Sequence, residues 1–588
     1  MRERLKGRWV DHVSGLVIAA VYVSVLLATA KPIGFTRDEG FYFDAAEDYL
    51  HWFELLWDRP AEALTKAAVS HYWNYNTEHP ALMKELFGLS HKLFNQKLQW
   101  LDPSTSFRLP GMLMAGLGLY LLFLLASELA GRRAAWAATA FMALMPQIFF
   151  HSHLTCFDLP ITTMILATTY AYWKSLRSVT WGVLTGVIWG LALATKLNAM
   201  FLPPVLVLHY LVWIIWGRKE DRGSGRCVKV LPWAFVSMAT LGPAVFFAHW
   251  PWIWWDTARR LGSYIGFHES HPFYTAAYFG ETIFRAPTPV SFPTVMTLIT
   301  VPGVTLLLAL AGGVLRLRSR LPGPMERLLR LEPGTKTGLG WSGDLLMALA
   351  FFWPIVLLSL PSIPKFGGTK HWMPSMPFLA LYAGFGFKAA SDAMAEIARG
   401  LAPARPLLRP VSVVLLFIVL AATPFWETVQ SHPYALSYYT PLAGGTPGAA
   451  DLGMCRQYWA STTVGVVPWL DEHMPPRSNV FFHDTAYPSF RMYQKDGALR
   501  KDILWGGIAG SRAAMVHHEH QKSEDEYDIW TAFGTATPST VLTLAGVPLV
   551  SVFEPNGPYR SYWARHAAEV KKAEAALRAS TERLPDSW

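Results

Sequence analysis

Two adjacent carboxylates, Asp38 and Glu39, come directly after the first long apolar run of the chain, in the stretch TRDEGFYF (36–43). Carboxylates held among aromatic side chains at a membrane surface could take the proton of a hydroxyl or amine that attacks a lipid-linked group. The alternative is that acids flank a membrane helix simply because water begins there. The positions of the other polar residues therefore decide how the pair is interpreted.

A second set of candidates lies in the segment NTEHPALMKELFGLSHKLF (76–94). After Pro80 the apolar residues recur at helical spacing, which predicts a helix lying in the membrane interface. Glu78 precedes this helix, and four polar residues are expected on the side opposite the apolar stripe: Lys84, Glu85, His91 and Lys92. Such a helix could hold a membrane-embedded substrate at a fixed depth, or it could be an amphipathic linker with no other role.

Asp158 and Lys196 are ionisable residues at the ends of apolar runs. Asp158 lies in HSHLTCFDLP (151–160), where the following Pro160 makes a helix cap the alternative to a chemical role. Lys196 ends an apolar helix in ATKLNAM (194–200), where it could snorkel to the interface. An ionisable group at this depth is nonetheless a candidate for function.

Two later segments add bases. The stretch 249–285 is rich in Trp and Tyr, as expected of an interfacial belt, but a belt does not require His268 and His271 in the same segment. These histidines could bind an anionic head group. Segment PSIPKFGGTKHWMP (361–374) places three more bases around a flexible Gly-Gly pair: Lys365, Lys370 and His371. The alternative there is a basic turn.

A polytopic membrane scaffold must position these residues. The 588-residue chain is 52% hydrophobic and 16% charged, which indicates several membrane spans and a soluble portion. A span needs ~20 mostly apolar residues, and several runs are shorter, so the predicted number of about eleven spans could change by two. The runs lie near 14–33, 109–128, 134–150, 159–173, 180–194, 199–216, 230–249, 293–315, 344–360, 372–390 and 411–425.

Basic clusters orient these spans, because Lys and Arg near span ends are retained on the cytoplasmic side. The N-terminus has four basic residues within 2–8 and is predicted to be cytoplasmic, and alternation also puts 131–133, 217–229 and 316–320 inside. All the candidate acids and bases then face the outside of the cytoplasmic, or inner, membrane. Orientation accounts for much of the net charge of +9, so no nucleic-acid partner is expected.

An odd number of spans puts the C-terminal region on the periplasmic side. From residue 427 the apolar runs become short, with candidate strands at 479–483 and 548–553 and a charged helical pattern at 564–580. The predicted domains are a transmembrane domain over 1–426, with a large first outer loop at 35–108, and a small soluble α/β domain over 427–588.

Acids at two places and bases at three others, all on one side of the membrane, suit the transfer of a group from a lipid phosphate. A carboxylate accepts the proton of the incoming acceptor while cations stabilise the departing phosphate. Glu78, Asp158 and His268 could also hold a divalent metal, although their spacing resembles no compact metal motif. Metal dependence is left open.

With these residues in place, the chain resembles a membrane glycosyltransferase of the GT-C class, in the branch of protein O-mannosyltransferases and bacterial aminoarabinose transferases (family 39/83 type). The resemblance covers residues 1 to about 425. Four short motifs in a fixed order carry it: Asp38-Glu39; Glu78, Pro80 and Leu82; Asp158 and Pro160; and Thr195-Lys196.

The resemblance implies a sugar donor on a polyprenyl phosphate, reached from the bilayer, with transfer on the periplasmic face and inversion at the anomeric carbon. It makes Asp38 the catalytic base, with Glu39 beside it to orient the acceptor or stabilise the loop, and Asp158 the second-loop acid. The substrate-binding candidates are Glu78, Lys84, Lys196, His268, His271, Lys370 and His371. The segment HPAL (79–82) has one proline where relatives often have two, and 437–449 does not match the sugar-binding insert of eukaryotic mannosyltransferases.

The acceptor, whether a lipid, a glycan or a protein, is left open by the loops. The alternative that is not an enzyme is a transporter or flippase of lipid-linked sugars. A transporter is expected to place ionisable residues near mid-membrane, in broken helices and often in two related halves. Here they gather at one surface, which favours the enzyme.

Overall fold

The computed structural model describes residues 2–217, 232–270, 273–318, 340–401, 405–519, 523–556 and 575. The chain forms two compact units, each assembled from three segments. The first unit consists of Met1–Ile33, Tyr42–Thr275 and Ile283–Gly445. The second consists of Gly34–Phe41, Ala276–Thr282 and Thr446–Trp588.

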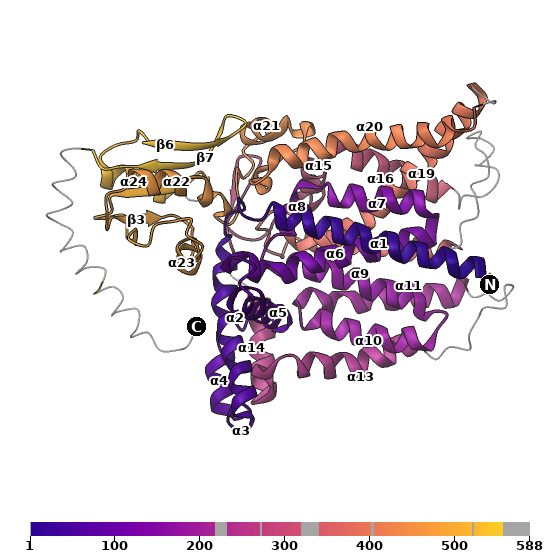
Figure 1. The fold of residues 1–588 in the computed structure, drawn as a ribbon, viewed down its shortest axis with the longest axis horizontal. Coiled ribbons are helices and arrows are strands. Elements are labelled where there is room, and N and C mark those ends of the chain that lie inside the picture. The colour runs from indigo at the N-terminus through magenta and orange to yellow at the C-terminus, as the bar shows by residue number, and fades with distance from the viewer. Residues whose placement is uncertain are drawn as a thin grey trace. The chain divides into compact units, whose positions relative to one another are not determined.

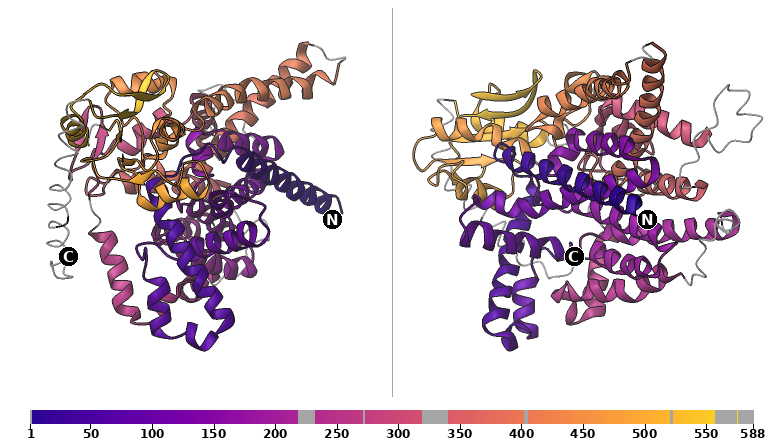
Figure 2. Two further views of the ribbon diagram at one scale, coloured as in Figure 1. Left: turned by 60° about the vertical axis from the view of Figure 1, so that its left-hand side comes forward. Right: turned by 45° about the vertical axis from the view of Figure 1, so that its right-hand side comes forward.

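The first unit is helical, and most of its long helices run alongside one another, while α2 (Arg37–Asp58), α4 (Lys66–Trp73) and α14 (Thr257–Glu269) run across them (Figure 1). Figure 2 shows the same arrangement from two other sides. Helix α2 (Arg37–Asp58) begins in the second unit and continues in the first. The other α-helices of the first unit are α1 (Arg2–Ala28), α3 (Pro60–Ala63), α4 (Lys66–Trp73), α5 (Leu82–Ser90), α6 (Pro103–Ala130), α7 (Arg132–Ala143), α8 (Pro146–His151), α9 (Asp158–Ser175), α10 (Val179–Leu193), α11 (Leu202–Val212), α13 (Trp233–Ala248), α14 (Thr257–Glu269), α15 (Phe292–Thr300), α16 (Gly303–Arg318), α18 (Gly340–Ser359), α19 (Met376–Leu401) and α20 (Leu408–Ser431).

Several of these helices are long and apolar enough to cross a membrane, judged by length and composition. Within the described ranges five qualify: Trp9–Ala28, Pro103–Ala130, Leu197–Ile215, Trp341–Ser359 and Leu408–Ser431. Val179–Leu193 and Trp233–Ala248 are apolar but shorter. The helical membrane class is thus confirmed, while the number of eleven spans stays a prediction.

One predicted span is broken. The apolar run 293–315, which was predicted as one span, is divided into α15 and α16, and these meet at an angle of 117°. The first helix stops there because Pro302 lacks the N–H that would continue it and pushes the preceding residue out of helical geometry. The backbone N–H of Thr440 donates to the carbonyl of Ile299, 2.7 Å away, at the end of α15.

Helices α10 and α13 approach closely because glycine lines their contact. A Cβ atom on Gly186 would lie 2.4 Å from the carbonyl oxygen of Ser237, so no larger residue fits there without moving the backbone. The Ser237 hydroxyl donates to the carbonyl of Val183 at 2.6 Å, which ties the two helices together. A short hydroxyl side chain can therefore replace apolar packing at this crossing.

An aromatic cluster holds α2, α4 and α14 to the short 3₁₀ helix η4 (Pro251–Trp254). Trp73 stacks on Tyr49 with ring centroids 3.9 Å apart, and Trp250 meets Tyr264 edge-on at 5.0 Å. Paired aromatic rings bury large apolar areas and add ~1 kcal/mol per pair beyond that burial. This cluster supports the start of α5, which carries one group of candidate residues.

The second unit contains a five-stranded sheet in the order β4-β3-β5-β7-β6. Strand β3 pairs in parallel with β4 and β5, and β7 pairs antiparallel with β5 and β6. The α-helices of this unit after residue 446 include α22 (Val467–His473), α23 (Tyr487–Lys495) and α24 (Ser523–Phe533). The strands are β3 (Asn479–Phe482), β4 (Leu504–Trp505), β5 (Ala513–His517), β6 (Thr540–Leu544) and β7 (Val547–Phe553).

Strands β3 and β7 coincide with the two strands expected at 479–483 and 548–553. The helical pattern expected at 564–580 lies outside the described residues, apart from Ala575. The last segment of the first unit ends at Gly445, and the last segment of the second unit begins at Thr446, whereas the sequence analysis predicted a domain boundary between residues 426 and 427. The predicted boundary stays a prediction.

Candidate active site

Asp158 and Lys196 form a buried ion pair in the first unit. Lys196 Nζ lies 2.6 Å from Asp158 Oδ1, and the two side chains are 12% and 6% exposed. Asp158 is the first residue of α9, whose N-cap is Phe157 with no side-chain hydrogen bond. The capping alternative for Asp158 therefore does not apply, and Lys196 pairs within the protein instead of snorkelling outward.

A second lysine, Lys370, and the imidazole of His151 lie near this pair. Burial raises the pKa of the Asp158 carboxyl, but Lys196, Lys370 and His151 together hold it below its usual value. Burial also lowers the pKa of His151 to about 4, with Lys370 and Lys196 adding to the decrease and Asp158 opposing it. The imidazole of His151 is thus neutral at neutral pH, while one carboxylate is shared by two lysines.

Lys370 and His371 begin the 3₁₀ helix η5 (Lys370–Ser375), and one residue, Thr369, separates them from two glycines in left-handed conformation. Lys370 is buried, with its ammonium 5.0 Å from the centre of the Phe366 ring. Lys365 has a structural position instead, because its ammonium bonds to the Thr288 hydroxyl and donates to the carbonyl of Leu360 at 3.0 Å. The flexible Gly-Gly pair thus delivers Lys370 toward Asp158 while Lys365 fixes the start of the loop.

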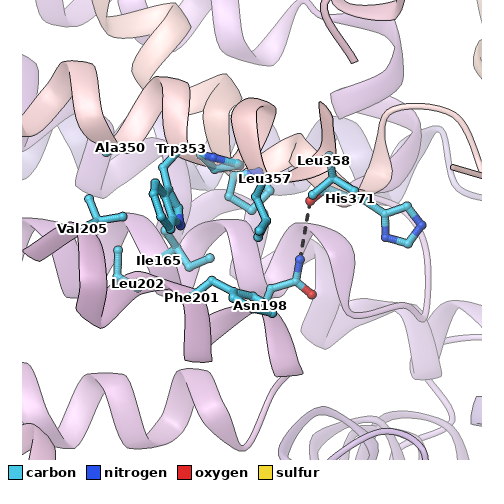
Figure 3. A pocket seen from close by; sticks show the side chains of 12 residues that line it. Ile165, Asn198, Phe201, Leu202, Val205, Ala350, Trp353, Leu357, Leu358 and His371 are labelled. Atoms are coloured by element: carbon cyan, nitrogen blue, oxygen red, sulfur yellow. Dashed lines mark hydrogen bonds between the residues drawn. The ribbon is translucent and has the colours of Figure 1, made fainter. Parts of the chain in front are cut away.

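A small apolar pocket lies between α9, α11 and α18 (Figure 3). Its walls are aliphatic and aromatic, with Trp353 among them, and its polar end is formed by Asn198 and His371. Asn198 Nδ2 donates to the His371 carbonyl, 3.5 Å away, and the His371 ring points away from the apolar side chains. Lys370 directly precedes His371, and Lys196 lies two residues before Asn198, so the polar end of the pocket and the charged group share the same two chain segments.

Lys84 organises the segment that carries Glu78. Its ammonium donates to the carbonyls of Asn76 and His79 at 2.7 and 2.9 Å, and Asn76 Nδ2 donates to Glu78 Oε1 at 2.6 Å. Burial lowers the pKa of Lys84 to about 7, while Glu78 and Glu85 favour its charged form. Its position suits a structural role in the 76–79 turn.

The amphipathic helix predicted after Pro80 is present as α5 and the π-helix η1 (His91–Lys97), and its polar side faces the protein interior. The polar residues Lys84, Glu85 and His91 are buried, whereas Leu86, Leu89 and Leu93 are exposed. The polar side chains find partners inside: Glu85 accepts from His249, and His91 Nδ1 bonds to the Ser106 hydroxyl. In a membrane protein the medium outside is itself apolar, so the leucines need no core.

His79 is a site residue that the sequence reasoning missed. Burial lowers the pKa of its imidazole well below the usual value, and Lys196, Lys84 and His268 lower it further. Its buried Nδ1 atom has no hydrogen-bond partner among the residues that the structure describes. His268, on α14, bonds through Nε2 to the Glu78 carbonyl at 3.0 Å. Only the position of His79 directly after Glu78 could have indicated it.

In the second unit, Thr36 and Glu39 form a capping box at the start of α2. The N–H of Thr36 donates to Glu39 Oε2 at 2.9 Å, and the N–H of Glu39 donates to the Thr36 hydroxyl at 3.4 Å. This reciprocal pairing satisfies two backbone donors at the helix start. Glu39 is fully buried, so its carboxylate has a structural partner; a catalytic role for it stays a prediction.

Asp38 is the second residue of α2, and its side chain is 26% exposed. Its Oδ1 atom lies 3.9 Å from Arg37 Nε, farther than a hydrogen bond. The N-terminal end of a helix favours a negative charge at this position. Asp38 is therefore a solvent-accessible carboxylate on a fixed helix end.

The structure brings together, within the first unit, most of the predicted residues: Glu78, Lys84, Asp158, Lys196, His268, Lys370 and His371. Asp38 and Glu39 belong to the second unit, and His271 lies outside the described residues. In the part of the chain that the structure describes, no group of three or more His, Cys, Asp or Glu side chains could hold a metal ion.

Three solved structures are similar in fold over most of their length. ArnT from Cupriavidus metallidurans in the apo state is 14% identical (TM-score 0.48), covering 91% of this chain and 97% of that one. The same protein bound to undecaprenyl phosphate is 15% identical with the same score and coverage. The Archaeoglobus fulgidus oligosaccharyltransferase in the apo form is 11% identical (TM-score 0.46), covering 88% and 71%. All three scores lie below 0.5, and no conclusion on function rests on them.

No curated protein sequence matches the chain. Residues 78–252 match the family described as dolichyl-phosphate-mannose-protein mannosyltransferase. This segment contains Glu78, His79, Lys84 and both members of the Asp158–Lys196 pair. The family match confirms, for residues 78–252, the resemblance to GT-C membrane glycosyltransferases that the short motifs predicted.

Proposed function

We propose that this protein is a glycosyltransferase that moves a sugar from a polyprenyl-phosphate donor to an acceptor at the outer face of the cytoplasmic membrane, with inversion. One observation carries the proposal: an apolar pocket whose polar end neighbours a buried group of cations, within a unit that contains the family-matched segment. A lipid phosphate has the same two parts, an apolar chain and an anionic head.

The cations suit the phosphate. Lys196 and Lys370 share one carboxylate, Asp158, so the group has an excess of positive charge that a phosphate would balance. In a buried setting such cations stabilise the charge that develops as the sugar departs. We assign Lys196, Lys370 and His79 to the phosphate, with His268 and His371 beside them.

Asp158 is better suited to orienting Lys196 than to accepting a proton. A carboxylate whose pKa is held low by two lysines is a weak base. Its hydrogen bond to Lys196 instead fixes the direction of the ammonium. Glu78 is proposed to face the sugar, because Asn76, and through it Lys84, holds its carboxylate in place.

Asp38 is proposed as the base. It is partly exposed, on a helix start secured by the Thr36–Glu39 capping box, and a displacement with inversion needs one carboxylate to take the acceptor's proton. The acceptor, a lipid, a glycan or a protein, is not assigned. The orientation with a cytoplasmic N-terminus and a periplasmic second unit follows from the distribution of Lys and Arg.

One observation favours the alternative of a flippase. Transporters often use broken helices, and the α15–α16 pair is broken by 117°. The break itself, at Val301-Pro302, contains no ionisable residue, whereas transport sites gather such residues at broken helices. The enzyme is therefore the better interpretation.

The decisive experiment uses the purified full-length protein in vesicles with a radiolabelled polyprenyl-phosphate sugar and a membrane extract as acceptor source. We expect release of polyprenyl phosphate, with the sugar attached to an acceptor in the opposite anomeric configuration. Movement of a fluorescent donor analogue between leaflets, with no cleavage of the sugar–phosphate bond, would instead establish the flippase. The Asp38→Asn protein is the matched control, because it should bind the donor without cleaving it.

A further inference from the structure

The short segment that carries Asp38 is held by residues from the far end of the chain, all within the second unit. The Phe35 N–H donates to the Tyr493 hydroxyl, and the Arg37 N–H donates to the Trp459 carbonyl, both at 2.9 Å. The rings of Phe35 and Tyr493 also pack with centroids 4.5 Å apart. The start of α2 is thus fixed by its surroundings as well as by its own capping box.

Close backbone approach strengthens this attachment. A Cβ atom on Gly40 would lie 2.8 Å from the backbone nitrogen of Ser489, so the first turn of α2 presses against the start of α23. The Ser489 hydroxyl donates to the Thr36 carbonyl at 3.1 Å. Small shifts of the C-terminal residues would therefore move the helix end that bears Asp38.

The charged contact in this region joins Arg37 to Asp484. Arg37 Nη1 donates to Asp484 Oδ1 at 2.9 Å, and the Asp484 side chain is only 7% exposed. The same guanidinium approaches Asp38 no closer than 3.9 Å. Arg37 therefore lies between two carboxylates and is bonded to the buried one.

Asp484 is presented by a strained turn. It follows β3 and His483 and has φ of +53°, a left-handed conformation that Asp tolerates better than most residues. The turn is fixed on its other side, because the His517 N–H donates to His483 Nδ1 and His483 Nε2 bonds to Asp525, each at 3.1 Å. A conformation kept at some cost, at the end of a parallel strand, indicates a specific task for its side chain.

We propose that Asp484 is a positioning residue for Asp38: it binds Arg37 and so keeps the guanidinium from forming a close ion pair with the catalytic carboxylate. This inference rests on the proposed function, in which Asp38 accepts the acceptor's proton. A guanidinium in direct contact with Asp38 would stabilise its charged form and make it a weaker base. Asp484 would thus act on Asp38 through Arg37.

The first test removes the charge of Asp484 and keeps its shape. In Asp484→Asn the side chain still tolerates the left-handed turn, but Arg37 is no longer held by a carboxylate and can pair with Asp38. We expect kcat to fall about 10-fold with the donor KM changed less than about 2-fold, since coupled neighbours interact by a few kcal/mol at most. Wild-type kcat in this variant would overturn the inference.

The second test separates positioning from simple stabilisation. The double variant Arg37→Gln/Asp484→Asn keeps a neutral hydrogen bond and removes the guanidinium from Asp38. Its kcat should return to within about 3-fold of the wild type, because the two substitutions are coupled and not additive. A double variant as slow as the single one would mean that the pair only stabilises the fold, and would overturn the inference.

A matched control exists in the same unit. Arg500 Nε bonds to Asp502 Oδ1, also at 2.9 Å, and the same guanidinium donates to the carbonyls of Asp471 and Met474 at the end of α22. Asp502→Asn should leave kcat unchanged, and a loss equal to that of Asp484→Asn would overturn the specific role of Asp484. Asp38→Asn in the same assay tests the proposed function separately. If the Asp38→Asn protein retains turnover, the assignment of Asp38 as the base is wrong. If Asp38→Asn is inactive and Asp484→Asn is fully active, only the inference about Asp484 is wrong.

Discussion

Each unit of this protein contains an acid and a base that lie far apart in the sequence, and the two pairs are used in opposite ways. In the first unit Lys196 binds Asp158 directly at 2.6 Å, in a setting that excludes water. In the second, Arg37 lies beside Asp38 but is bonded to Asp484. The same residue types thus give one carboxylate that is bonded directly to its lysine and another whose neighbouring arginine is bonded to a different carboxylate.

The largest effect is expected at the carboxylate that the second unit leaves accessible. Asp38→Asn should lower kcat about 1000-fold, as loss of a general base commonly does, while the protein still folds and inserts in the membrane. Turnover is measured with a defined polyprenyl-phosphate sugar. Asp58→Asn, at the exposed last residue of α2, is the control and should behave as wild type. Near-normal turnover of Asp38→Asn would mean that Asp38 and Asp158 do not differ in the way proposed, because Asp38 would not be the base.

The committed pair of the first unit should show its effect in binding. Lys196→Ala should raise the donor KM about 50-fold and leave the acceptor KM within about 2-fold, because truncating one member of a buried charge pair costs several kcal/mol. Lys174→Ala is the control, since Lys174 bonds to Glu128 in an exposed pair at the other end of α9. Equal losses for donor and acceptor would contradict a phosphate role.

A smaller effect on turnover is expected from Lys84, which holds the 76–79 turn of the first unit in place. Lys84→Met should destabilise the protein by ~2 kcal/mol, since the carbonyls of Asn76 and His79 lose their buried donor. Donor turnover should fall about 10-fold as the Glu78 turn loosens. Thermal unfolding and kinetics measure the two changes. Lys92→Met, at a partly exposed lysine of η1, should change neither stability nor turnover. A Lys84→Met protein that loses stability but keeps full turnover would argue against a positioning role for Lys84.

The smallest effect is expected from substitution of Glu39, and it distinguishes Glu39 from its neighbour Asp38. Glu39→Gln can still form the capping box and should retain both stability and turnover, whereas Glu39→Ala should lose ~1 kcal/mol of stability. Unfolding curves and turnover of the two variants are compared side by side. An inactive but stable Glu39→Gln protein would show that Glu39 has a chemical role.

Local patterns predicted local structure well. The apolar runs coincide with helices, and two short β-rich stretches coincide with β3 and β7. The T-x-x-E signature of a capping box was also present at Thr36 and Glu39, although the acid there was assigned to chemistry. The break in the apolar run around Pro302 could have been predicted from the proline itself, but a count of apolar residues does not take it into account.

Other features depend on context that a single sequence does not contain. The polar face of α5 points inward because partners such as His249 and Ser106, far along the chain, receive it. His79 became a candidate only when folding placed Lys196 and His268 near it. Arg37 and Asp484 are separated by 447 positions, and no periodicity connects residues across such a distance.

The break between α15 and α16 has a consequence for how the chain is built. The last carbonyls of a helix lack partners within it, and an unpaired carbonyl is costly where no water is available. The Ile299 carbonyl is satisfied by the backbone of Thr440, which follows α20, the last candidate span. During synthesis the broken pair therefore leaves the ribosome long before its partner exists. The Ile299 carbonyl can therefore pair with Thr440 only after nearly all the helices of the first unit have been synthesised.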